Sequence, residues 1–124
     1  MNDEASSVAI VQPMYELKPS DHSTSVSQLL GLVSFVLNNE PEGPVTIVSR
    51  NGADLCGVLC AVHNIIQQLQ MDGEVDIFTT VRQLQIRRPE LCSSLEEYGM
   101  IYNCVLNNIR ALDESSAENI YCNQ

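Results

Sequence analysis

The apolar residues of this chain form two kinds of pattern, a helical spacing and short runs, and each predicts a different kind of element. Spacings of three and four residues predict helices over residues 26–37, 56–70, 75–87 and 95–112. Ser25 is the predicted N-cap of the first helix. Ser94, with Glu97 three residues later, predicts a capping box at the start of the last one. Asp72-Gly73 and Pro89 are the predicted stops of the second and third helices.

Two further segments have the pattern of strands. Residues 7–17 are rich in β-branched side chains, and Pro13 predicts an edge or a bulge there. Residues 45–48 are continuously apolar, as in a strand that is buried on both faces. Strands and helices together predict an α/β fold, and Phe78, Tyr98 and Tyr102 are expected in its core.

Composition limits the classes of function. The 124 residues, 44% of them hydrophobic, are enough for one modest domain with a real core. The net charge of −10 argues against binding to nucleic acids or anionic membranes. Five cysteines without a C-x-x-C pair favour reduced thiols over a zinc or disulfide site. The polar N-terminus and short apolar runs predict no signal peptide and no membrane span. Neither a metal nor a cofactor is expected.

Residues 43–57 have the layout of a phosphate-binding loop, because a predicted strand leads through a short polar loop into a helix. Backbone N–H groups in such a loop can point at an anion. The candidate phosphate-loop residues are Ser49, Arg50, Asn51, Gly52, Ala53, Asp54 and Leu55.

Several motifs resemble those of the protein tyrosine phosphatase family. They are GPVTI, GVLCAV, LEEYGMIY and, above all, VDIFTTVRQLQIRRPEL, which begins at Val75. The order of elements is similar to the C-terminal half of a phosphatase domain, most of all a degenerate second (D2-like) domain of a receptor-type enzyme. The resemblance implies a central mixed sheet flanked by helices, of which residues 1–112 would supply a part, with the degenerate loop at 48–57.

The resemblance also assigns roles at the loop. The family's nucleophilic cysteine falls on Ser49, its activating histidine on Val48 and its phosphate-binding arginine on Leu55. Asp21 is the candidate general acid, one residue out of step with the family's acid-bearing loop. The two glutamines of a later loop fall on Ser93 and Glu97.

These replacements predict that catalysis is lost. A thiolate can exist near neutral pH in a positive local potential, whereas a serine hydroxyl needs an adjacent base. Leu55 cannot bind phosphate as a guanidinium does, and the Asp54 carboxylate would repel it. The sequence therefore predicts a catalytically inactive pseudophosphatase with a regulatory or scaffolding role. The alternatives are a working phosphotyrosine hydrolase that uses Ser49 or Cys56, and an unrelated α/β binding module.

The remaining residues, 113–124, are predicted to be a flexible acidic tail. Tyr121 followed by Asn123 resembles a phosphorylation motif that adaptor SH2 domains bind. The expected partners are this adaptor and another phosphatase domain of the same receptor or a homologue. The expected location is cytoplasmic, as the intracellular part of a single-pass receptor.

Overall fold

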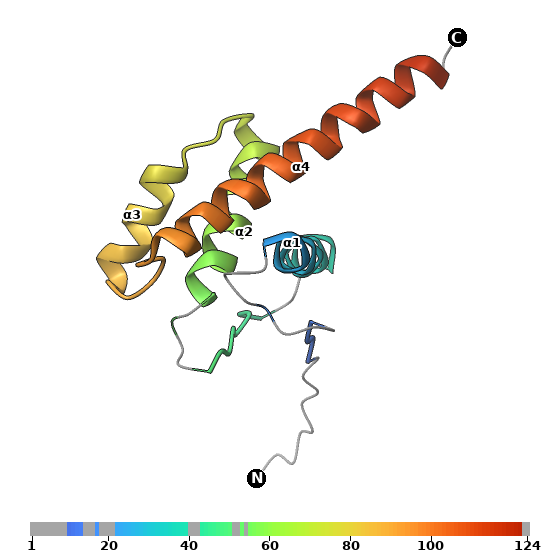
Figure 1. Ribbon diagram of the computed structural model, residues 1–124. Helices are drawn as coiled ribbons and strands as arrows, with labels where there is room; N and C mark the ends of the chain where they lie inside the picture. The colour runs from blue at the N-terminus through green and yellow to red at the C-terminus, as the bar shows by residue number, and fades with distance from the viewer. Residues whose placement is uncertain are drawn as a thin grey trace.

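The computed structural model describes residues 10–13, 17, 22–39, 43–50, 53 and 55–122, with the backbone alone for 22–24 and 115–122. Four helices make up its regular structure: α1 (His22–Asn39), α2 (Cys56–Asp72), α3 (Ile77–Arg87) and α4 (Leu95–Cys122). Helix α2 packs against each of the other three, and α4 also packs against α1 (Figure 1). None of these described helices is both long enough and apolar enough to span a bilayer.

The core lies where α1, α2 and α4 meet. Helix α2 buries the face that its apolar spacing predicts, with Val58, Val62 and Ile65 fully enclosed. The side chains that enclose this face come from α1 and from the first half of α4: Leu29, Val33, Met100, Ile101 and Cys104. Burial of these apolar groups is the main stabilising contribution to such a fold.

The predicted stop of α2 is confirmed. Gly73 adopts a left-handed φ of 70°, and its N–H donates to the Leu69 carbonyl at 2.9 Å. Glycine adopts this conformation without steric cost, which is why it commonly ends a helix.

Side-chain caps start the next two helices. The Asp76 carboxylate accepts a 3.0 Å bond from the Thr79 N–H at the start of α3. Ser94 Oγ accepts the Glu97 N–H at 3.1 Å and donates to Glu97 Oε1 at 3.1 Å. Ser94 is therefore the N-cap of α4, as predicted.

Two predicted helix boundaries are wrong. Helix α1 begins at His22, so Ser25 lies inside it, fully buried, rather than at its N-cap. Helix α4 continues past Leu112 to Cys122. The apolar pattern ends at Leu112, but a helix needs no apolar face where it packs against nothing, so hydrophobic spacing cannot locate that end.

The predicted α/β fold class, with its central mixed sheet, is also wrong for the described residues, which contain no strand. Residues 45–48 are extended, but Val45 is 49% exposed and Val48 is 87% exposed. In the other predicted strand, Ile10 is 88% exposed and Val11 is 47% exposed. A strand is stable only when neighbouring strands pair with its backbone, and no described segment does so.

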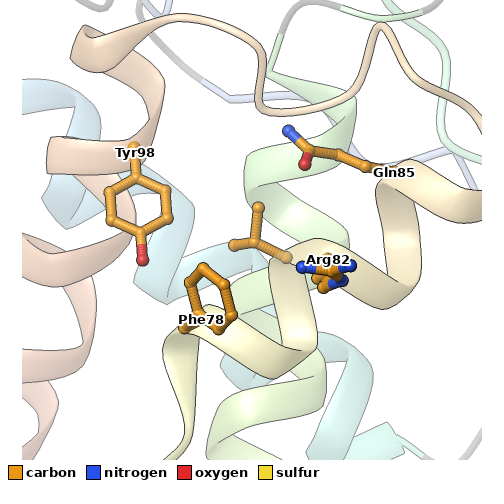
Figure 2. A pocket seen from close by; sticks show the side chains of 5 residues that line it. Phe78, Arg82, Gln85 and Tyr98 are labelled. Carbon is orange, nitrogen blue, oxygen red and sulfur yellow. The ribbon is translucent and has the colours of Figure 1, made fainter.

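The aromatic residues predicted in the core lie at the surface instead. Phe78 is 63% exposed and Tyr102 is 49% exposed, while Tyr98 is half-buried. Figure 2 shows Phe78 and Tyr98 facing a groove that opens between α3 and α4. Only Ile77, Thr80 and Val81 of α3 are buried, so this short helix covers the core along a narrow stripe.

Candidate functional site

The candidate loop approaches the start of α2 as an extended segment. Val48 is exposed, Ser49 is half-buried and the Arg50 side chain is exposed. The described loop residues are 43–50, 53 and 55, and none of them is His, Asp or Glu. A general base for Ser49 is therefore missing from this part of the loop.

Ser49 lies against the first residue of α2. The Cys56 thiol donates to Ser49 Oγ across 3.1 Å, and it lies 3.9 Å from the Ile47 carbonyl oxygen. Cys56 is only 7% exposed. The two side chains that the sequence offers as nucleophiles are thus hydrogen-bonded to each other.

Leu55 precedes α2 in a strained conformation. Its φ of 63° lies in the left-handed region, and its side chain makes no capping bond. In the first turn, the Leu59 N–H donates to the Leu55 carbonyl at 3.0 Å, and the Gly57 N–H donates to the Ala53 carbonyl at 3.5 Å. Leu55 brings no cation to the helix start, so it cannot bind an anion there as a guanidinium would.

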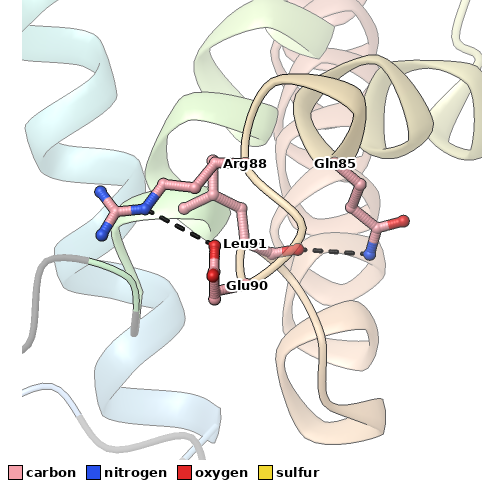
Figure 3. A network of polar contacts seen from close by, with 4 residues as sticks. All are labelled: Gln85, Arg88, Glu90 and Leu91. Carbon is pink, nitrogen blue, oxygen red and sulfur yellow. Dashed lines mark hydrogen bonds and ion pairs between the residues drawn. The ribbon is translucent and has the colours of Figure 1, made fainter.

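The turn between α3 and α4 packs closely against the start of α2. A Cβ added at Gly57 would lie 2.9 Å from Leu91 Cβ and 3.0 Å from the Cys92 backbone N. Gln85 Nε2 holds this turn by donating to the carbonyls of Leu91 at 3.2 Å and Cys92 at 3.4 Å. Figure 3 shows the bond to Leu91 and the neighbouring Arg88–Glu90 ion pair, in which Nε and Oε2 are 3.8 Å apart.

Glu97 is a buried acid beside this turn. It is 5% exposed, and its Oε2 has no hydrogen-bond partner among the described residues. Burial, helped by the negative charge of Glu97 and by Cys60, raises the pKa of Cys92 to about 12. Glu97 is the position on which the second of the two family glutamines falls. In this structure its side chain accepts the Ser94 hydroxyl in the cap of α4.

The thiols deeper in the fold are poor nucleophiles. Burial raises the pKa of Cys104 to about 12, and burial followed by the charge of Cys56 raises the pKa of Cys60. These groups stay protonated at neutral pH, and it is the thiolate that reacts. Only Ser49 and Cys56 remain as candidate nucleophiles at the described part of the loop.

Comparison with known sequences decides the ancestry of this loop. The family model "Protein-tyrosine phosphatase" matches residues 9–107, which is most of the chain. This chain belongs to the protein-tyrosine phosphatase family.

Receptor-type tyrosine phosphatases are among its relatives. Human receptor-type tyrosine-protein phosphatase alpha is 28% identical over 96 residues, which are 77% of this chain and 12% of the relative. The eta phosphatase of Mus musculus is 30% identical over 83 residues, covering 67% of this chain and 7% of the relative. The receptor-type epsilon phosphatase of Rattus norvegicus is 32% identical over 62 residues, which are 50% of this chain and 9% of the relative. The chain therefore spans only a small part of the length of these phosphatases.

Several of the predicted phosphatase-site residues cannot be placed. The candidate general acid, three residues of the loop and the last residue of the docking motif lie outside the described residues: Asp21, Asn51, Gly52, Asp54 and Asn123. Tyr121 has a described backbone, within α4, but no described side chain. Its role in adaptor docking stays a prediction, as do the phosphatase roles of Ser49 and Leu55.

Two features of this phosphatase loop were missed from the sequence. The Cys56–Ser49 bond depends on how the loop folds back onto α2, for which the sequence carries no local signal. The close approach at Gly57 had a signal, because a glycine inside a helical pattern lowers helix stability and often has a packing reason.

Proposed function

We propose that this chain is a catalytically inactive part of a receptor-type tyrosine phosphatase, most similar to a D2-like domain, with a regulatory or scaffolding role on the cytoplasmic side. The observation that carries the proposal is the bond from the Cys56 thiol to Ser49 Oγ at 3.1 Å. In this bond the thiol acts as a weak hydrogen-bond donor to Ser49 Oγ and not as the base that an attacking hydroxyl needs.

The chemistry of phosphate monoester cleavage supports the same conclusion. The nucleophile has to be deprotonated, and the charge on the phosphoryl oxygens needs fixed donors in the transition state. A guanidinium supplies two donors and a full positive charge. Leu55 supplies neither, and Val48 offers no proton acceptor.

Turnover of para-nitrophenyl phosphate by the purified chain tests the loss of catalysis. We expect no vanadate-sensitive turnover above the buffer rate, with an active tyrosine phosphatase as the assay control. Ser49→Ala and Cys56→Ala should give the same trace as the unchanged chain. Turnover that vanadate inhibits and that either substitution removes would refute the proposal and favour the working hydrolase.

The scaffolding role needs its own test. We propose that the partner is a phosphatase domain of the same receptor or of a homologue. Biolayer interferometry with immobilised chain should detect the phosphatase domain of receptor-type tyrosine-protein phosphatase alpha, and Ser49→Ala should bind it equally well. Binding that is lost with Ser49→Ala would place the contact at the loop, and absence of binding would contradict this choice of partner.

A further inference from the structure

A groove between α3 and α4 lies apart from the candidate loop. Its cavity is about 320 Å³, and it is lined by Phe78, Val81, Arg82 and Gln85 from α3 and by Tyr98 from α4 (Figure 2). Val81 is 4% exposed and forms the buried apolar base, whereas Phe78 stands at the rim, 63% exposed. The volume is at the small end of the range for ligand sites, roughly 300–1,000 Å³.

The wall formed by α4 is aromatic and partly open to solvent. The rings of Tyr98 and Tyr102 have centroids 5.3 Å apart and an interplanar angle of 55°. Tyr102 is 49% exposed, so the apolar surface continues past the groove. Exposed aromatic side chains beside a concave apolar base are characteristic of sites that bind another chain.

The charge that lines the groove comes from α3. Arg82 is the charged residue among the five that line it, in a chain of net charge −10. Arg88 pairs with Glu90, but Arg82 makes no ion pair with another described residue. The Gln85 Nε2 group donates to two carbonyls of the following turn, so it is engaged within the chain. Arg82 is thus the available cation of the groove.

One acid lies near the opposite end. Asp76 caps α3 through the Thr79 N–H, and its charge is among the causes that raise the pKa of Tyr98, after the hydrogen bond with Tyr102 and burial. A negatively charged ligand would therefore be repelled at the Asp76 end and attracted at the Arg82 end.

We propose that this groove is a docking site for an acidic peptide segment of a partner protein. An Asp or Glu carboxylate of the peptide pairs with Arg82, and a neighbouring aliphatic or aromatic side chain covers Val81 between Phe78 and Tyr98. The charge-assisted bond to a guanidinium is the stronger kind of hydrogen bond, and the apolar contact supplies buried area. Neither Ser49 nor Leu55 takes part, so the inference stands whether or not the loop is catalytic.

Fluorescence anisotropy with two pools of labelled peptides tests the proposal. One pool alternates Glu with Leu, Ile or Phe, and the matched pool has Gln in place of Glu. We expect the acidic pool to bind up to about fivefold more tightly than the Gln pool, because an ion pair with an exposed arginine contributes up to about 1 kcal/mol. Arg82→Gln should remove this difference, and Phe78→Ser should weaken both pools. Arg110→Gln, an equal charge change at an exposed position on α4, is the matched control and should leave binding unchanged.

Three results would overturn the proposal. They are equal binding of the two pools, no binding of either, and equal effects of Arg82→Gln and Arg110→Gln. Sedimentation velocity measures whether a second copy of this chain occupies the groove instead. A monomer is expected, while a dimer that Phe78→Ser dissociates would show that self-association fills the groove. Circular dichroism of each variant verifies that these exposed substitutions leave the helices intact.

Discussion

At the scale of single residues, Gly57 offers a sharp test of the packing around the candidate loop. A methyl group there would meet Leu91 Cβ at 2.9 Å and the Cys92 backbone N at 3.0 Å, and backbone cannot move aside cheaply. Gly57→Ala should lower the free energy of unfolding by about 1–3 kcal/mol, the usual cost of overpacking. Urea denaturation measures it.

Gly31→Ala is the matched control for this substitution. Gly31 is an exposed residue inside α1 with nothing within 4 Å of an added Cβ. Alanine is the better helix former, so this variant should gain up to about 1 kcal/mol. A Gly57→Ala protein as stable as the Gly31→Ala protein would contradict the close approach of the turn to α2.

Some residue-level features could be predicted from the sequence and others could not. Ser94 was identifiable as a cap because its partner Glu97 lies three residues later, which is the spacing of a capping box. The surface positions of Phe78 and Tyr102 were not identifiable, since the side of a helix that finds a partner depends on residues distant in the sequence. The Cys56–Ser49 bond could not be predicted either, because it depends on how the loop folds back onto α2.

At the scale of elements, Asp76 should make the start of α3 sensitive to acid. Its bonds with Thr79 lower the pKa of its carboxyl group below the usual value. A lowered folded-state pKa stabilises the fold above the unfolded-state pKa, and this stabilisation is lost as the pH falls through the folded-state pKa. Asp76→Asn keeps a capping oxygen but cannot titrate.

The Asp76→Asn variant should therefore be less stable than the unchanged chain at neutral pH and lose less stability on acidification, so that the two proteins converge in acid. Urea midpoints between about pH 5 and about pH 3 measure the difference. Parallel curves for the two proteins over this range would show that the carboxylate does not stabilise the folded state.

Helices and strands also differ in how far the sequence predicts them. All four helices follow from apolar spacings within one segment, and the structure contains each of them. The strands predicted at residues 7–17 and 45–48 required pairing partners, which local pattern cannot supply. The end of α4 was missed because the helix backbone there runs away from the other helices (Figure 1), so the fold requires no apolar stripe in that part.

At the scale of the whole molecule, one substitution made at two places distinguishes a helical core from a core built on a sheet. Val62 is fully buried on α2, and Val48 is 87% exposed. Val62→Ala should cost about 2 kcal/mol of unfolding free energy from lost burial and the remaining cavity. Val48→Ala should stay within about 0.5 kcal/mol of the unchanged chain. Similar losses at both sites would indicate that residues 45–48 are buried.

The far end of α4 has a practical consequence. The residues of this helix that contact the core lie between Tyr98 and Ile109, and Figure 1 shows the helix continuing away from the other three. At 1.5 Å per residue, the part from Arg110 to Cys122 reaches roughly 20 Å. A fluorophore or sensor surface attached through the C-terminus would thus be held clear of both the loop and the groove. Binding assays tethered there would leave both faces accessible to a ligand in solution.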